Sequence, residues 1–216
     1  MISSSSGVAL TKVNFDLSVY FVADPLLCAG RDVVDVVMMA VKGGATLVQY
    51  RNKHAPLNDV LAEAAMLQEW LSDTGVPLLI NDYVDVAQAV GAAGVHLGQG
   101  DCSPQEARAK LGAEAIIGQT AFTVEHMAAV DAAVVDYVGV GPFYETKTDK
   151  GKPVLGAEAF AALVRLSPVP VVGIGGVTPD NARAVIKAGA SGVAMMRSVS
   201  EAETPEKVVR AFLDIL

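Results

Sequence analysis

The sequence predicts a closed (β/α)8 barrel of the TIM type, with one parallel sheet inside and helices outside. Apolar segments suited to buried strands alternate with helical segments along the chain, and short connections join them. The turn after the first expected strand is D-P-L-L-C, without the glycine-rich fingerprint that open doubly wound sheets usually carry. Three returns from helix to strand, A-V-K-G-G-A-T-L-V, A-V-G-A-A-G-V-H-L and V-I-K-A-G-A-S-G-V-A-M, pass through Gly and Ala, which suits a close approach to a barrel.

The first half of the chain contains four expected strand–helix units. The apolar run L-S-V-Y-F-V-A-D (17–24) predicts the first strand, and a helix follows over 32–43. A-T-L-V-Q-Y-R (45–51) predicts the second strand, followed by an amphipathic helix over 57–72 that Gly75 and Pro77 end. The third and fourth units pair strands at 78–82 and 95–99 with helices at 84–91 and 103–111.

The second half continues the alternation. Strands are expected at 115–121 and 137–141, with a helix over 123–133 between them, and at 169–173 and 192–196, with a helix over 179–188 between them. A helix over 205–216 closes the chain. No long Pro- or Ser-rich stretch divides the sequence, so we expect one domain over residues 1–216, with residues 1–14 as a poorly ordered tail.

Composition excludes several classes of protein. With 52% hydrophobic and 19% charged residues, the chain is not disordered, and it has enough apolar residues for strands buried on both faces. No apolar run is long enough to span a membrane, and M-I-S-S-S-S-G lacks the features of a signal peptide. Cys28 and Cys102 are too few for a disulfide framework, which favours a cytoplasmic location.

The formal net charge of −8 argues against a nucleic-acid partner, because such proteins usually present a basic face. Neither nucleic acid nor a membrane is therefore expected as a partner. The oligomeric state stays open, a homo-oligomer included.

Three apolar segments end in charge at the same end. The second strand runs out into Arg51 and Lys53, the third into Asn81 and Asp82, and the fourth into Gln99 and Asp101. The carboxyl ends of all strands of such a barrel share one face, where the active site lies. We therefore expect these side chains to converge on one mouth.

Asp82 and Asp101 predict a magnesium site. Carboxylates beside neutral oxygen donors, with no thiolate near, suit Mg²⁺, which completes its octahedron with water and substrate phosphate. The alternative is that Asp82 caps the next helix. Arg51 and Lys53 are separated by one residue, can point the same way, and suit an oligophosphate held against the metal. Their alternative role is that of ordinary surface charges.

Two further segments suit anions. The loop G-V-G-P-F-Y-E-T-K-T-D-K-G-K-P (139–153) has the hydroxyls and charges of a mobile cover over an anionic ligand, or of a solvated loop. V-V-G-I-G-G-V-T-P-D-N-A places glycines before a helix expected to start at Thr178-Pro179, which is the usual phosphate site of barrels or else only a tight turn. The spacing of His54, His96 and His126 marks neither a metal site nor a triad, so each is interpreted as structural or solvated.

Taken in order, the motifs resemble those of the thiamine phosphate synthase family. V-Q-Y-R-N-K is similar to that family's V-Q-x-R-x-K, L-L-I-N-D to its I-N-D, and V-H-L-G-Q-G-D to its H-L-G-Q-x-D. I-I-G-Q-T, G-P-F-Y-E-T-K-T and the I-G-G before P-D-N follow in the right order. The resemblance runs from the second expected strand to the end of the eighth.

The resemblance implies a transferase of the thiamine pathway. Hydroxymethylpyrimidine diphosphate would lose pyrophosphate through a pyrimidine cation, and the nitrogen of hydroxyethylthiazole phosphate, or of its carboxylated form, would capture the pyrimidine carbon. The resemblance implies that the pyrimidine diphosphate is bound by Gln49, Arg51, Lys53 and Asn81, and Mg²⁺ by Asp82 and Asp101. It places the thiazole phosphate at Thr146, Thr148, Gly176, Met196 and Arg197, and it adds Thr120 and Lys147 as substrate-binding residues.

Three departures from the family pattern concern substrate detail. Where the family has T-x-T-K, this chain has T-K-T-D-K, so Asp149 occupies the place of a catalytic lysine that Lys150 or Lys147 could replace. Thr120 stands for a serine and keeps its hydroxyl. Arg197 stands for another serine and is a different kind of phosphate ligand.

Two other functions compete with a synthase. A related thiazole tautomerase would share the barrel but would lack the diphosphate and metal residues and would use a histidine near strand five, where this chain has Q-T-A-F. A non-catalytic barrel that only binds a phosphorylated metabolite is the second, and Asp149 is its best support.

Overall fold

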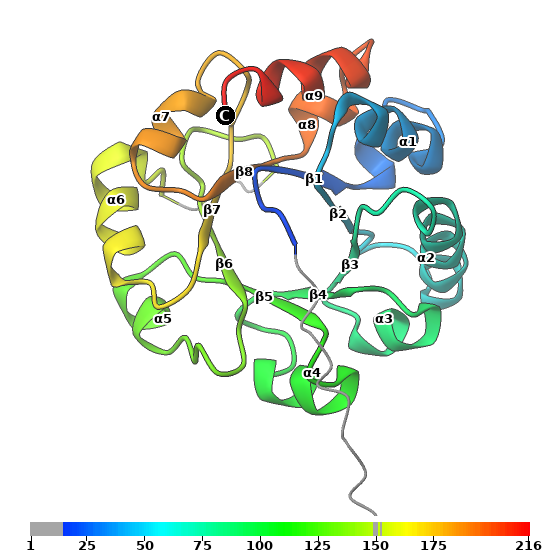
Figure 1. The fold of residues 1–216 in the computed structure, drawn as a ribbon, viewed down its shortest axis with the longest axis horizontal. Coiled ribbons are helices and arrows are strands. Elements are labelled where there is room, and N and C mark those ends of the chain that lie inside the picture. The colour runs from blue at the N-terminus through cyan, green and yellow to red at the C-terminus, as the bar shows by residue number, and fades with distance from the viewer. Residues whose placement is uncertain (1–14, 149–150, 152) are drawn as a thin grey trace, which may run out of the picture.

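The computed structural model describes residues 15–148, 151 and 153–216, and it confirms the closed parallel barrel. Neighbouring strands pair in chain order, and β8 pairs with β1 to close the sheet (Figure 1). The predicted tail, residues 1–14, lies outside the described residues. The strands are β1 Val19–Ala23, β2 Leu47–Tyr50, β3 Leu78–Asn81, β4 Gly94–Leu97, β5 Ile116–Thr120, β6 Tyr137–Val140, β7 Val171–Ile174 and β8 Gly192–Met195.

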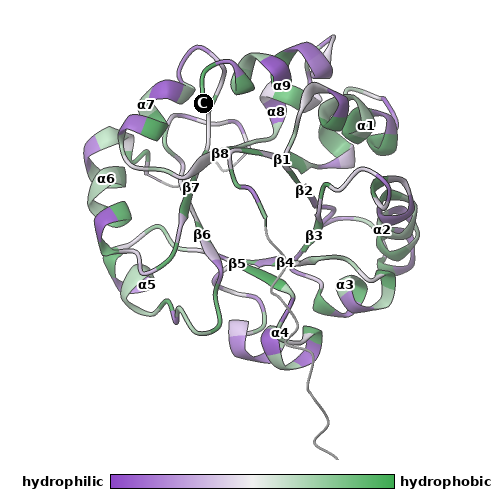
Figure 2. Ribbon diagram, in the orientation of Figure 1, coloured by the Kyte–Doolittle hydropathy of each residue, from purple (hydrophilic) through white to green (hydrophobic). Residues whose placement is uncertain are grey.

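Helices form a ring outside the strands (Figure 1). They are α1 Val33–Gly43, α2 Leu57–Leu71, α3 Val84–Val90, α4 Pro104–Leu111, α5 Val124–Ala128, α6 Gly156–Leu166, α7 Ala182–Lys187, α8 Arg197–Ser200 and α9 Pro205–Leu213, with a short 3-10 helix, η1, at Pro25–Leu27. Figure 2 shows hydrophobic and hydrophilic residues on the same helices of this ring, as expected for helices that cover a barrel. Within the described residues, no helix is long and apolar enough to cross a membrane.

The strands are buried on both faces, which explains their nearly continuous apolar sequences. One set of side chains packs between the strands and the helices, and a smaller set fills the barrel. The filling includes Tyr20, Leu47, Leu79, Ile116 and Tyr137. The interior is therefore a packed core, and a ligand can enter only at an end of the barrel.

Residues before β1 cover the end of the barrel where the strands begin. Phe15 and Leu17 pack against the interior set, and the rings of Phe15 and Tyr137 have centroids 6.0 Å apart. A Cβ at Gly192 would lie 1.8 Å from the carbonyl oxygen of Leu17, so this segment lies directly against β8. The opposite end, where the strands finish, remains for the site.

Three helices are clearly shorter than predicted, and one of them, α9, ends at Leu213 where the sequence predicts residue 216. The helix expected over 123–133 ends at Ala128, because Asp131 then forms its own turn by accepting a hydrogen bond from Ala133 N (2.9 Å). The helix expected from 179 starts at Ala182. Asn181 Oδ1 accepts from Thr178 N (2.8 Å), and this contact holds the preceding residues in a turn.

Three elements were not predicted. α6 follows the loop at 139–153, η1 follows β1, and α8 begins directly after the strand end at Met196. α8 has four residues and η1 has three, too few to show a hydrophobic period. α6 has an amphipathic sequence, G-A-E-A-F-A-A-L-V-R-L, in which Phe160 and Leu163 are buried.

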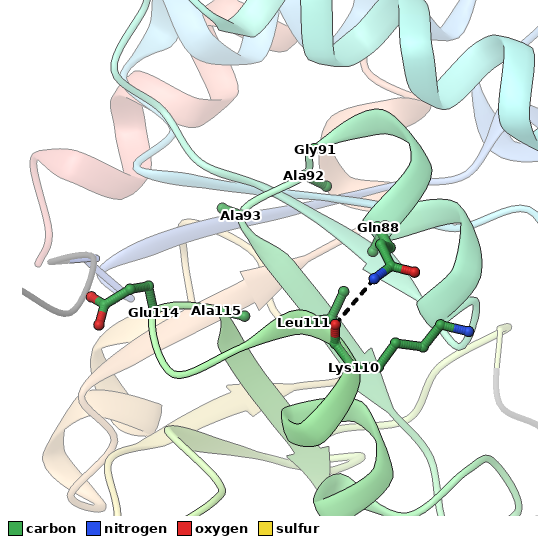
Figure 3. Close-up of a pocket in the computed structure, with 9 residues that line it drawn as sticks. Gln88, Gly91, Ala92, Ala93, Lys110, Leu111, Glu114 and Ala115 are labelled. Atoms are coloured by element: carbon green, nitrogen blue, oxygen red, sulfur yellow. Dashed lines mark hydrogen bonds between the residues drawn. The ribbon is translucent and has the colours of Figure 1, made fainter. Parts of the chain in front are cut away.

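A pocket between the ends of α3 and α4 lies at the other end of the barrel from the predicted mouth (Figure 3). It is lined by Ala87, Gln88, Gly91, Ala92, Ala93, Lys110, Leu111, Glu114 and Ala115, from the segments that lead into β4 and β5. Gln88 Nε2 donates to the carbonyl oxygen of Lys110 across it (3.1 Å). None of the predicted site residues lines this pocket.

Candidate functional site at the barrel mouth

The predicted site residues are the last residues of the strands or lie in the loops that follow them, at one end of the barrel. β2 leads to Arg51 and Lys53, β3 to Asp82, and β8 to Met196 and Arg197. Thr120 is the last residue of β5, and Gly176 follows β7. Asp149 and Lys150, on which the predicted replacement of the family lysine depends, lie outside the described residues.

Asp82 and Asp101 form an acidic pair next to Lys53. The Nζ atom of Lys53 lies 2.8 Å from Oδ2 of Asp82, and Oδ2 of Asp101 accepts a hydrogen bond from Gly98 N (2.6 Å). Burial raises the pKa of the Asp82 carboxyl, and the nearby Asp101 carboxyl raises it further, whereas Lys53 lowers it. The two carboxylates are therefore close enough to repel one another, and a cation would relieve this repulsion.

The alternative role of Asp82 as a helix cap does not hold. Tyr83 is the N-cap of α3, and no side chain makes a capping hydrogen bond there. Asp82 instead has a φ of 63°, in the left-handed region that non-glycine residues rarely adopt. Because a strained backbone often marks a functional position, this conformation supports a ligand-facing role for the carboxylate.

The acidic pair fits magnesium better than a transition metal. Among the described residues, no three or more His, Cys, Asp or Glu side chains are grouped so that they could hold a metal. Two carboxylates are what Mg²⁺ commonly takes from a protein, with water and substrate phosphate as the remaining ligands. Nearby, the amide Nδ2 of Asn81 is buried and has no hydrogen-bond partner in the part of the chain that the structure describes, so it can donate to a ligand.

Arg51 is held by a residue that the sequence reasoning missed. Its Nη1 atom forms an ion pair with Oδ2 of Asp24, which follows β1 and is only 3% exposed. The other carboxylate oxygen of Asp24 accepts from Leu26 N (3.1 Å) at the start of η1. V-A-D also ends an apolar strand in charge, so the signal that identified Asp82 could have identified Asp24.

Arg51 and Lys53 contact carboxylates on opposite sides of β2, from β1 and β3 respectively. The residue between them, Asn52, is buried and donates to Glu63 of α2 (3.2 Å). Its Oδ1 atom accepts from Ala55 N (3.2 Å). The segment that presents the two cations is thus anchored to a helix, unlike a surface loop with ordinary charges.

On the other side of the mouth, the loop after β6 meets the ends of β7 and β8. Arg197 Nε donates to Thr148 Oγ1 (3.0 Å), and its Nη1 atom forms an ion pair with Glu201, which follows α8. Gly176 has a φ of 66°, and a Cβ there would lie 2.4 Å from the carbonyl oxygen of Glu145. Glycine is therefore required for the close contact between this loop and β7.

Inside the barrel, directly below the mouth, His96 is a partly buried residue with two partners. Its Nδ1 atom lies 2.9 Å from the Tyr137 hydroxyl, and its Nε2 atom lies 3.0 Å from Oγ1 of Thr120. Burial lowers the pKa of His96 to about 4, with a smaller opposing effect from Asp101. The interpretation of His96 as structural or solvated missed its contact with a predicted substrate-binding residue.

The comparisons with known proteins show the family. The family described as thiamine monophosphate synthase matches residues 19–199. The chain is 45% identical to a thiamine-phosphate synthase of Azorhizobium caulinodans over 204 residues, which are 94% of this chain and 96% of the relative. It is 45% identical to a thiamine-phosphate synthase of Xanthobacter autotrophicus over 199 residues, covering 91% of this chain and 94% of the relative.

A solved structure of similar fold carries the name of the same kind of enzyme. The fold superposes on a thiamine phosphate pyrophosphorylase from Pyrococcus furiosus with a TM-score of 0.83 and 32% identity, covering 92% of this chain and 95% of that one.

Proposed function

Because this chain belongs to the thiamine monophosphate synthase family, we propose that its barrel mouth joins a hydroxymethylpyrimidine diphosphate to a hydroxyethylthiazole phosphate. The products are thiamine phosphate and pyrophosphate, and the chain is a transferase. Both substrates are small molecules. The cysteines of the described region are free thiols, which supports a reducing, cytoplasmic location as part of the proposal.

Arg51 and Lys53 would bind the diphosphate of the pyrimidine substrate, with Gln49, Asn81 and Thr120 as neutral partners. The guanidinium group of Arg51 suits a bidentate contact with phosphate oxygens, and the ammonium group of Lys53 is a compact charge. The support is that both cations extend from one anchored segment beside the acidic pair. Asn81 contributes an amide nitrogen, Nδ2, that is buried without a hydrogen-bond partner among the described residues.

Asp82 and Asp101 would hold Mg²⁺. When bound, the ion would neutralise negative charge that develops on the departing pyrophosphate. The two carboxylates supply the oxygen ligands that Mg²⁺ prefers, and in this structure Lys53 balances part of their negative charge.

In the reaction, the bond between the pyrimidine methylene carbon and the diphosphate oxygen breaks, and its electron pair leaves with pyrophosphate. The thiazole nitrogen then donates its lone pair to the carbon, forming the new carbon–nitrogen bond. No protein base is needed for these two steps. The residues of the mouth act by neutralising the leaving group and by excluding water from the pyrimidine cation.

The thiazole phosphate would bind opposite the acidic pair, at Thr146, Lys147, Thr148, Gly176, Met196 and Arg197. The support is the contact between Thr148 and Arg197, which brings the loop after β6 to the end of β8. Lys150 remains the proposed replacement for the family lysine.

The observation that carries the proposal is the acidic pair with Lys53 at the end of three adjacent strands. Pyrophosphate release by the purified chain tests it directly, with Mg²⁺ and both substrates present. We expect release that needs the metal and both substrates and that is lost in Asp82→Ala. Asp85→Ala is the matched control, because Asp85 is an exposed carboxylate on α3 that pairs with Lys110 away from the mouth.

The competing functions predict other results. A non-catalytic binding barrel would retain the thiazole phosphate but release no pyrophosphate, and Asp149→Lys would then be the first variant to examine. A thiazole tautomerase would convert its thiazole substrate without the pyrimidine diphosphate.

A further inference from the structure

We infer that a hydrogen-bonded chain inside the barrel orients the Thr120 hydroxyl as a donor toward the substrate, with His96 and Tyr137 as positioning residues. The chain runs Gln49, Tyr20, Tyr137, His96, Thr120 and crosses five strands. This inference rests on the proposed function, which places Gln49 and Thr120 at the substrate.

The links of the chain are short and continuous. Gln49 Nε2 donates to the Tyr20 hydroxyl (2.5 Å), and the hydroxyls of Tyr20 and Tyr137 are 2.7 Å apart. His96 then connects Tyr137 at 2.9 Å to Thr120 at 3.0 Å. Gln49 is 4% exposed and both tyrosines are 1% exposed or less, so water has little access to the links between them.

Two glycines make room for the chain. A Cβ at Gly118 would lie 2.2 Å from the ring of Tyr137, and a Cβ at Gly139 would lie 3.1 Å from Cε1 of His96. Any larger residue at Gly118 would displace the tyrosine, whose ring also packs against Tyr20 and His96. The barrel is thus shaped around these two rings, whereas an incidental contact would need no such space.

In the inferred arrangement, the protons run in one direction along these links. The amide nitrogen of Gln49 donates to the Tyr20 hydroxyl, and Tyr20 gives its own proton to Tyr137. Tyr137 in turn donates to Nδ1 of His96, which must be the unprotonated ring nitrogen. The proton of a neutral His96 therefore lies on Nε2 and is donated to Thr120 Oγ1.

Thr120 accepts from His96, so its own proton is free for a ligand. It can donate to an acceptor such as a phosphate oxygen. At the other end, one amide hydrogen of Gln49 is used inside the barrel, and its Oε1 atom can accept from a ligand. The chain therefore presents a donor at one point of the mouth and an acceptor at another.

The tautomer of His96 tests the proton order without any substrate. The full chain, labelled with ¹⁵N, has three histidines, so the His96 ring signals are those that disappear in His96→Gln. We expect the proton on Nε2, with Nδ1 at the chemical shift of an acceptor. We expect Tyr137→Phe to abolish this fixed tautomer. A proton on Nδ1 in the unsubstituted chain would overturn the inference.

Steady-state kinetics test whether the hydrogen-bonded chain affects substrate binding through Thr120. Loss of the Thr120 orientation in Tyr137→Phe should raise KM for the pyrimidine diphosphate about five- to tenfold, the effect of one weakened hydrogen bond. In a Thr120→Val background the same substitution should change KM little, because the two residues act as a unit. Equal effects in both backgrounds would reduce Tyr137 to a structural role and overturn the inference.

Tyr144→Phe is the matched control, since it removes a tyrosine hydroxyl that bonds only to the Asn181 carbonyl in the described structure. The experiments distinguish a wrong proposed function from a wrong inference about the hydrogen-bonded chain. If no pyrophosphate is released under any condition, the function is wrong, whereas the tautomer still reports the proton order. If release occurs but Thr120→Val leaves KM unchanged, Thr120 does not touch the substrate, and the inference fails while the function stands.

Discussion

The ammonium nitrogen of Lys53 lies 2.8 Å from Oδ2 of Asp82, so a lysine already balances one carboxylate of the proposed magnesium site. The same lysine is proposed to bind the diphosphate of the substrate. Lys53 and a metal ion therefore compete for Asp82 in the free enzyme, and the substrate offers Lys53 another anion when the metal binds.

Lys53→Met should separate these two roles. Without the ammonium group, the Asp82–Asp101 pair lacks its balancing charge, so Mg²⁺ should bind the free protein about fivefold to thirtyfold more tightly, equivalent to roughly 1–2 kcal/mol. Pyrophosphate release should nevertheless fall, because the diphosphate loses a cation. Calorimetric titration with Mg²⁺ and a pyrophosphate assay measure the two effects.

Lys110→Met is the control for that experiment, since Lys110 pairs with Asp85 on the outer helices and should change neither quantity. Weaker Mg²⁺ binding in Lys53→Met would contradict the competition and would suggest that the lysine organises the metal ligands.

Asp24→Asn should weaken substrate binding through Arg51. The asparagine keeps an oxygen for Leu26 N but removes the charge that holds the guanidinium group. Arg51 would then sample other conformations, and we expect KM for the pyrimidine diphosphate to rise about tenfold, or about 1.4 kcal/mol. Steady-state kinetics measure this, and unchanged KM at reduced kcat would instead indicate a role for Asp24 in the chemical step.

Much of the barrel could be predicted because its strands are buried on both faces. Runs such as L-L-I-N-D show an apolar segment and its functional end together, and the barrel fold then brings all such ends to one mouth. α6 was not predicted because it directly follows a polar loop, and that loop determined how the whole region was interpreted. The helices predicted over 123–133 and 179–188 are longer than α5 and α7 because Asp131 and Asn181 form local turns that a hydrophobic period does not reveal.

The partners of site residues were harder to predict than the residues themselves. A sequence shows that Arg51 ends a strand, but not that Asp24, 27 residues earlier, meets its guanidinium group. The interior chain was hidden for a similar reason: Tyr20, His96 and Tyr137 are isolated polar groups in apolar runs, and only closure of the barrel connects them. Spacing rules for metal sites or triads cannot detect contacts that cross a closed sheet.

Glu201→Gln should strengthen binding of the thiazole phosphate. Glu201 forms an ion pair with Arg197 and therefore competes with a phosphate for the same guanidinium group. Removing the carboxylate should lower KM for the thiazole phosphate about twofold to fivefold, or roughly 0.5–1 kcal/mol, as for a partly exposed ion pair. Glu206→Gln, which alters a carboxylate that pairs with Lys42 and Arg210, is the control.

A rise in that KM would contradict the competition and would indicate that Glu201 holds Arg197 in its binding position. Arg197→Ala tests the premise that both cases share, contact between the arginine and the phosphate: it should raise this KM, and Glu201→Gln should then change it little.

His96 should make the fold sensitive to mild acid. Burial lowers its pKa to about 4 from an ordinary value of 6.5, so below pH 6.5 the unfolded chain takes up a proton that the folded chain refuses. The stabilisation from neutral His96 is therefore complete above pH 6.5 and is lost as the pH falls toward 4. Between pH 7.5 and 5 this contributes a loss of about 2 kcal/mol in the free energy of unfolding. Urea unfolding at both pH values should show a loss in the unsubstituted chain that exceeds the loss in His96→Gln by this amount, whereas equal losses would mean that His96 is readily protonated in the fold.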